Sequence, residues 1–122
     1  MIDLTETQRA TLEIISVQRK GSEITGLKIA RAIGLKERDS GKEGADMRSV
    51  INALRRKGYP ICANGKGYYY PESREEIAEY IESLAGRIES EQEALEGMGT
   101  ALPIWESTPE MREPPKQNII EI

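Results

Sequence analysis

Apolar residues recur at helical spacing along the chain, and the most regular stripe lies in residues 46–57. It consists of Met47, Val50, Ile51 and Leu54. These positions fall on one face of an α-helix, at i, i+3, i+4 and i+7. Asp46 can cap the start of this helix, and Gly58 is suited to end it in the left-handed conformation. The opposite face is polar and has no acidic residue between Arg48 and Lys57, so the pattern predicts a helix with a basic outer face.

A glycine-containing turn between two β-prone runs follows this helix directly. The runs are residues 59–63 and 68–70, and Asn-Gly-Lys-Gly separates them at residues 64–67. Asn and Gly tolerate the positive φ of tight turns, so the sequence predicts a β-hairpin with Lys66 at its tip. Cys62 lies in the first strand, where a small buried hydrophobe is a commoner role than a redox-sensitive thiol.

Two further helices are predicted before residue 46. A capping box at residues 5–8 starts the first, which is expected to run to about Lys20 and to end at Gly21. Thr25 can cap the second, and Gly34 can end it. The first part of the chain is therefore predicted to contain three helices followed by a hairpin.

A capping box at residues 73–76 begins a longer helix, which is expected to end near Glu96. Its apolar residues recur in alternating steps of four and three, and they are Ile77, Ile81, Leu84, Ile88, Leu95 and Met98. This spacing is typical of a coiled coil, with Glu91 at the one polar position of the seam. The helix either pairs with a second copy of the chain, the interpretation we favour, or packs on its own domain.

The last part of the chain has no sustained period and contains four prolines after Gly97. This composition predicts a mostly irregular acidic tail over residues 99–122. Trp105 is the single tryptophan, and it is either an anchor for a partner or packs on the long helix. The apolar end at residues 117–122 is loosely similar to short peptides that bind a replication or transcription protein.

The composition lacks the residues on which most enzyme active sites depend. The 122 residues include one Cys and no His, so the commonest general base and any thiolate or imidazole metal cluster are missing. The sequence has no phosphate-binding glycine loop, nucleophile elbow or catalytic triad. We therefore expect no enzyme activity, no metal and no cofactor. The single Cys and the lack of a long apolar or signal segment predict a cytoplasmic protein without membrane association.

The net charge of −4 averages two unlike parts of the chain. Residues 1–71 carry 13 Lys and Arg against 8 Asp and Glu, which gives +5, whereas residues 72–122 carry 4 against 13, which gives −9. A basic first part suits contact with a polyanion. The acidic second part either meets another protein or only keeps its helix solvated.

The residues around the predicted hairpin resemble a known family. The resemblance lies in residues 54–61, Leu-Arg-Arg-Lys-Gly-Tyr-Pro-Ile, and in residues 65–70, Gly-Lys-Gly-Tyr-Tyr-Tyr. These are similar to the end of the recognition helix and the wing of biotin-repressor-type winged helix-turn-helix domains. The resemblance covers about residues 5–71, and because no biotin-handling segment follows, it implies a DNA-binding fold rather than a biotin enzyme. The arrangement also resembles small winged-helix proteins of phages and prophages. A mixed-charge insert at residues 36–44 departs from the family and is either a further DNA contact or a solvated loop.

The predicted fold is mainly α with a small β-hairpin. It comprises a winged helix-turn-helix in residues 1–71, a long amphipathic helix in residues 72–98 and the irregular tail. The predicted function is sequence-specific binding of double-stranded DNA in transcription regulation, as a homodimer with helix 46–57 in the major groove. Base contacts are expected from Arg48, Ser49, Asn52 and Arg56. Phosphate contacts are expected from Arg55 and Lys66, to which the resemblance adds Lys28 and Arg31. Dimer contacts are expected from Ile77, Ile81, Leu84, Ile88 and Leu95.

An alternative function belongs to a different class. A winged helix can serve as a protein adaptor or inhibitor, such as a phage accessory protein, that acts through the acidic helix and tail. Such a protein binds its partner through residues 97–122 and does not bind DNA at low salt. A third interpretation is that the acidic part imitates DNA, in which case it competes with duplex for a basic partner.

Overall fold

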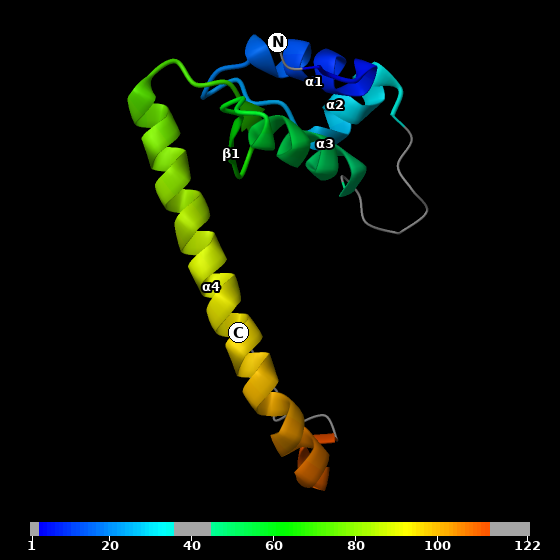
Figure 1. Ribbon diagram of the computed structural model, residues 1–122, viewed down its shortest axis with the longest axis vertical. Coiled ribbons are helices and arrows are strands. Elements are labelled where there is room, and N and C mark those ends of the chain that lie inside the picture. The colour runs from blue at the N-terminus through cyan, green and yellow to red at the C-terminus, as the bar shows by residue number, and fades with distance from the viewer. Residues whose placement is uncertain (1–2, 36–44, 113–122) are drawn as a thin grey trace, which may run out of the picture. The chain divides into compact units, whose positions relative to one another are not determined.

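The computed structural model describes residues 3–35 and 45–112, which form helices and one small sheet (Figure 1). In chain order the elements of these residues are α1 (Glu6–Ser16), α2 (Gly26–Ile33), α3 (Ala45–Arg56), β1 (Cys62–Asn64), β2 (Gly67–Tyr69), α4 (Arg74–Ser107) and the 3₁₀ helix η1 (Pro109–Arg112). The predicted helix-rich fold with a small antiparallel hairpin is confirmed. The chain divides into two compact units, a first unit of Met1–Ile81 and a second unit of Glu82–Ile122.

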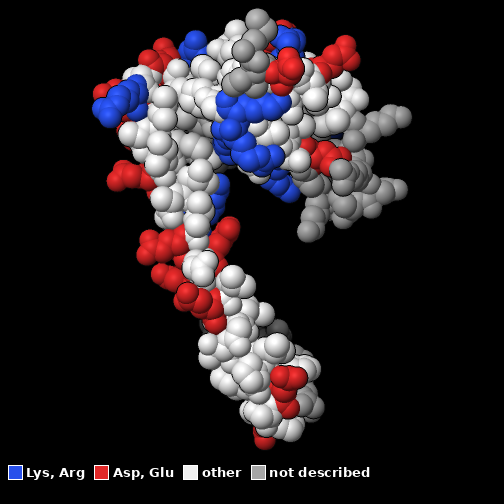
Figure 2. All heavy atoms as spheres, in the orientation of Figure 1, with Lys and Arg blue, Asp and Glu red and all other residues white. Residues whose placement is uncertain are grey.

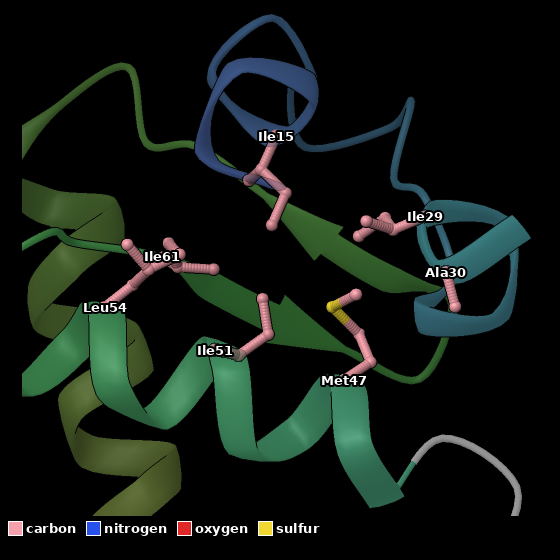
Figure 3. Packing of buried hydrophobic residues seen from close by; sticks show 7 residues of the cluster. All are labelled: Ile15, Ile29, Ala30, Met47, Ile51, Leu54 and Ile61. Carbon is pink, nitrogen blue, oxygen red and sulfur yellow. The ribbon is translucent and has the colours of Figure 1, made fainter. Parts of the chain in front are cut away.

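The core of the first unit lies where α1, α2 and α3 meet. Its buried apolar cluster consists of Ile15, Ile29, Ala30, Met47, Ile51, Leu54 and Ile61. Figure 3 shows that Met47, Ile51 and Leu54 point from α3 towards the side chains of the other elements. Burial of one such side chain contributes roughly 1.5–3 kcal/mol. The apolar stripe predicted from the sequence thus fixes which side of α3 faces inward.

The hairpin has the predicted turn. Cys62 pairs with Tyr69 and Asn64 pairs with Gly67, which leaves Gly65 and Lys66 as the two residues at the tip. The positive φ of the turn falls on Gly67, at 141°, and not on Gly65. The tip is therefore formed as expected, while the backbone freedom of glycine is used one position after it.

A third extended segment, which was not predicted, borders the hairpin. Ile24 forms an isolated antiparallel bridge with Tyr68, in which Ile24 N donates to Tyr68 O over 3.0 Å and Tyr68 N donates to Ile24 O over 2.8 Å. A Cβ built on Gly67 would overlap the carbonyl oxygen of Ile24. Glycine at position 67 therefore allows the hairpin to lie against the segment that leads into α2.

The helix ends agree with the sequence in four places. Thr5 caps α1 in a capping box with Gln8, and Thr25 caps α2. Gly34 at φ 71° and Gly58 at φ 98° follow α2 and α3 in the left-handed conformation. Short polar caps and terminal glycines carry local signals, which explains why these ends were predictable.

Two predictions about helix ends were wrong. The helix predicted to reach Lys20 ends at Ser16, because the carbonyl of Gln18 accepts a hydrogen bond of 3.0 Å from Tyr70 N. The residues after α1 thus leave the helix to meet the end of the hairpin. Asp46 is not the cap of α3, since this helix begins at Ala45 and places Asp46 in its first turn.

The longest helix extends beyond its predicted end near Glu96. α4 is 34 residues long and continues through Gly97 and Pro103 to Ser107. The irregular tail predicted from residue 99 was therefore wrong up to this point, and Trp105 lies within the helix. None of the helices in residues 3–35 and 45–112 combines the length and apolar character that crossing a membrane requires. The predictions for residues 36–44 and 117–122 lie outside the described residues.

Candidate nucleic-acid interface

The outer face of α3 consists of the residues predicted to contact bases. Among the side chains of residues 46–56 in this helix, three are buried and four are half-buried. The exposed ones, among its described side chains, are Arg48, Ser49, Asn52 and Arg56. At roughly 100° per residue they fall within about 100° of arc. We call this surface the α3 strip; it carries two guanidinium groups and no carboxylate.

The hairpin adjoins the first turn of α3. A Cβ built on Gly26, the first residue of α2, would lie 3.3 Å from Met47 Cγ and 3.4 Å from Tyr68 Cε2. α2, α3 and β2 therefore meet at this glycine. Arg48 follows Met47 in α3, and Lys66 lies two residues before Tyr68, so the beginning of the α3 strip and the hairpin turn belong to the same end of the first unit.

The turn that carries Lys66 is held by a short chain of hydrogen bonds. Lys66 N donates to Asn64 Oδ1 over 2.9 Å. Asn64 Nδ2 donates to Glu23 Oε2 over 2.7 Å, and Gly21 N donates to the same oxygen over 2.9 Å. The Lys66 side chain itself is exposed. A cation on a hairpin turn that is fixed in this way can contact a phosphate with little loss of backbone freedom.

The carboxylate of Glu23 makes this link dependent on pH. Hydrogen bonds from Gly21 N and the Asn64 side chain lower the pKa of Glu23 from 4.5 to about 2. A depressed carboxyl pKa adds stability that is fully present above pH 4.5 and is lost as the pH falls towards 2.

We therefore expect Glu23→Gln to reduce the loss of stability between pH 4.5 and 2. Thermal unfolding of both chains across this pH window measures the effect. Glu13→Gln, which changes an exposed glutamate on α1, is the matched control. An unchanged pH dependence in Glu23→Gln would show that this carboxylate does not hold the turn.

Lys28 and Arg31 are exposed on α2, on the side away from its buried residues Ile29 and Ala30. They lie on the helix that precedes α3 in the chain and packs against it. The structure thus leaves both side chains accessible to a ligand that reaches α2.

Arg55 differs from the other predicted phosphate contacts. Its side chain is half-buried, and its Nε donates to the carbonyl of Ile61 over 2.8 Å. Its guanidinium carbon lies 4.9 Å from the centre of the Tyr80 ring, in a cation–π contact. Such a contact contributes about 0.5–2 kcal/mol. Arg55 therefore joins α3 to the segment before β1 and to the first turns of α4, an arrangement that does not suit a phosphate contact.

Other cations of the first unit are also engaged within it. Arg19 lies 4.0 Å from Glu72, and Lys20 lies 3.2 Å from Glu79, which raises the pKa of Lys20. Lys57 Nζ donates to the carbonyl of Asp3 over 2.8 Å and to Gln8 Oε1 over 2.7 Å. Figure 2 shows Lys and Arg side chains gathered on the face of the first unit over α3. Arg19, Lys20 and Lys57 therefore each have a structural contact within the first unit.

Cys62 is buried, as predicted, and its Sγ lies 3.8 Å from the carbonyl oxygen of Pro60. Burial raises the pKa of the Cys62 thiol. The neutral thiol is the weakly reactive form, so this geometry fits a small apolar side chain and not a reactive cysteine.

Two contributors to the site were not found from the sequence. Glu23 supports the turn through Asn64, which is 41 residues away in the chain. Tyr80 holds Arg55 from a helix that the sequence assigned to pairing. Neither residue belongs to a motif, because each acts through a contact that exists only after folding.

Comparison with known proteins adds no family to this geometry. No protein-family model, no curated protein and no solved structure matches the chain.

Proposed function

We propose that this chain is a sequence-specific double-stranded DNA-binding protein of the winged helix-turn-helix type that acts in transcription regulation. The α3 strip is the observation that carries this proposal. An exposed helix face with two arginines, an asparagine and a serine has the donors and acceptors that base edges require.

The order and contacts of the elements support the winged helix-turn-helix type. α2 and α3 follow one another and share the core with α1, and a hairpin comes directly after α3. The bridge from Ile24 adds an extended segment to the hairpin, before α2 in the chain. This arrangement leaves one helix face and one turn uncovered at the same end of the unit, as groove and backbone contacts require.

In this proposal α3 enters the major groove, which is about 12 Å wide and admits an α-helix. Arg56 and Arg48 donate paired hydrogen bonds to the O6 and N7 of guanine, while Asn52 pairs with adenine. Ser49 donates to or accepts from a neighbouring base edge. The buried stripe of α3 keeps these side chains on the outer face because the helix cannot rotate without exposing Met47, Ile51 and Leu54.

Phosphate contacts position the helix without reading sequence. Lys66 on the hairpin turn and Lys28 and Arg31 on α2 take this role. Each neutralised phosphate releases counterions, so the affinity falls as the salt concentration rises. Arg55 is left out of the proposed set because its guanidinium is occupied by Ile61 and Tyr80.

Two single replacements separate the two roles. Arg56→Ala is expected to cost about 1–3 kcal/mol on the preferred sequence and to relax the preference at one position. Lys66→Ala is expected to weaken binding to all sequences alike. It should also reduce, by about 1, the slope of the logarithm of the binding constant against the logarithm of the salt concentration. Fluorescence anisotropy with a preferred and a scrambled duplex, at several salt concentrations, measures both effects.

Arg74→Ala is the control for loss of one positive charge, since Arg74 is exposed at the start of α4. It should leave affinity and preference nearly unchanged. If Arg56→Ala and Arg74→Ala have the same effect on every duplex, α3 does not read the sequence.

A further inference from the structure

α4 carries an apolar stripe that is largely exposed and is longer than the sequence predicted; Ile77 and Leu84 are its half-buried members. Because the helix continues to Ser107, Leu102 and Trp105 extend the alternating steps of four and three. We call the full set the α4 seam, and it consists of Ile77, Ile81, Leu84, Ile88, Glu91, Leu95, Met98, Leu102 and Trp105. From its first to its last residue it is about 42 Å long, at 1.5 Å per residue.

None of the side chains of α4 is buried. Within the seam, Ile88 is 59% exposed, Leu95 is 66% exposed and Met98 is 70% exposed. An apolar strip of this length, interrupted at Glu91, exceeds the scattered apolar residues that are normal on a soluble surface and marks an interaction site.

The period of the seam indicates what covers it. Steps of four and three average 3.5 residues per turn, and on a straight helix such a stripe drifts by about 20° per heptad. The drift disappears when two helices wind around each other as a coiled coil. The seam therefore fits another helix of the same period, and a second copy of this chain supplies one.

Charge is arranged so that two acidic helices can approach. The glutamates Glu82, Glu89, Glu93 and Glu96 lie outside the seam and its flanks, at the outer positions of the heptad. The positions that flank the seam are mostly small, and they include Ala85, Ala94, Gly99 and Ala101. Pro103 also falls at an outer position, so its ring does not occupy a place in the seam.

The two charged residues near the middle of the seam favour one orientation. In a parallel pair in register, Glu91 would face the Glu91 of the partner subunit, and like charges opposite each other are destabilising. In an antiparallel pair, Glu91 lies opposite Ile88 of the partner subunit and level with Arg87 of the partner subunit. Leu84 then faces the partner's Leu95. The contacts on both sides of the Glu91 and Ile88 pairs are therefore between apolar side chains.

We propose that α4 binds the α4 helix of a second copy of this chain as an antiparallel two-stranded coiled coil along the seam. The pairing depends only on α4 and not on DNA binding, so the two proposals can fail separately.

Sedimentation equilibrium of the full chain over a wide concentration range tests the pairing. The unmodified chain should sediment with the mass of two chains. Ile88→Glu places a carboxylate in the seam of each helix and should raise the dissociation constant about a hundredfold. Ser90→Glu adds the same charge two residues away, at an exposed outer position, and should stay dimeric.

A chain that remains monomeric at every concentration would overturn the proposal. A larger oligomer, or equal weakening by Ile88→Glu and Ser90→Glu, would overturn it as well.

Mild oxidation of variants that each carry one introduced cysteine, in addition to the buried Cys62, tests the orientation. A mixture of Leu84→Cys and Leu95→Cys chains should form the mixed disulfide, because these positions face each other in the antiparallel pair. Cross-linking of Leu84→Cys chains to one another would overturn the antiparallel arrangement.

Discussion

Replacing Leu54 with alanine is expected to lower the free energy of unfolding of the first unit by about 2–5 kcal/mol. Leu54 is fully buried in the cluster that joins α1, α2 and α3, next to Ile61 (Figure 3). The replacement removes apolar area and leaves a cavity at the C-terminal end of α3. Each 1 kcal/mol lost corresponds to a decrease of about 4–8 °C in Tm for a domain of this size.

The chain allows this loss to be followed in one unit. All five tyrosines lie in the first unit and the single tryptophan lies in the second. Urea unfolding followed by the near-UV circular dichroism of tyrosine should show the change, while tryptophan fluorescence should not. Val17→Ala, at a side chain that is 71% exposed, is the control and should cost less than about 0.5 kcal/mol. Equal effects of the two replacements would contradict the described core.

Replacing Gly67 with alanine is expected to destabilise the first unit by about 2–4 kcal/mol. The residue has a φ of 141°, and an added Cβ would overlap Ile24 O and lie 3.0 Å from Thr25 N. These are backbone atoms, which cannot move aside as a flexible side chain does. The change therefore strains the turn and breaks the hydrogen bonds between Ile24 and Tyr68.

Gly65→Ala is the matched control within the same turn. Gly65 has no positive φ, and no described atom outside its chain neighbours lies within 4 Å of its Cβ position. Its replacement should change the stability by less than about 0.5 kcal/mol. Thermal unfolding of the two variants, with amide hydrogen exchange at Tyr68, measures the difference. If Gly67→Ala is as stable as Gly65→Ala, the hairpin does not lie against the Ile24 segment.

The sequence was most informative where the signal is local. The stripe from Met47 to Leu54 and the glycine-containing turn at residues 64–67 define α3 and the hairpin without reference to the rest of the chain. The exposed α3 strip follows from the same pattern, because the residues opposite a buried stripe must face outward. These features contain the proposed base contacts.

The sequence was least informative where an element depends on a distant partner. Ile24 becomes an extended residue only because Tyr68 pairs with it. α1 stops at Ser16 because the following residues meet the hairpin. Arg55 has the charge of a phosphate contact, but its position beside Tyr80 gives it a structural role.

In the prediction of an irregular tail from residue 99, the helix preferences of single residues were given too much weight. Gly97, Gly99 and Pro103 each disfavour a helix interior, yet α4 continues through all three. Two side chains in this part of the helix bond to its carbonyl groups: Thr100 Oγ1 donates to Glu96 O over 3.2 Å, and Ser107 Oγ donates to Pro103 O over 3.0 Å. Bonds of this kind do not stabilise a helix interior. In the proposed pair, the seam residues Leu102 and Trp105 add apolar contacts that offset the unfavourable preferences.

Selection of bound sequences from a random duplex pool, with the salt dependence recorded on the enriched duplex, tests whether α3 recognises DNA. We expect one enriched motif, present in two copies if the chain binds as a dimer, and an affinity that falls as the salt concentration rises. We also expect that Arg56→Ala loses part of the enrichment. No enrichment, together with an affinity that does not change with salt, would contradict DNA recognition by α3 and would favour a protein adaptor.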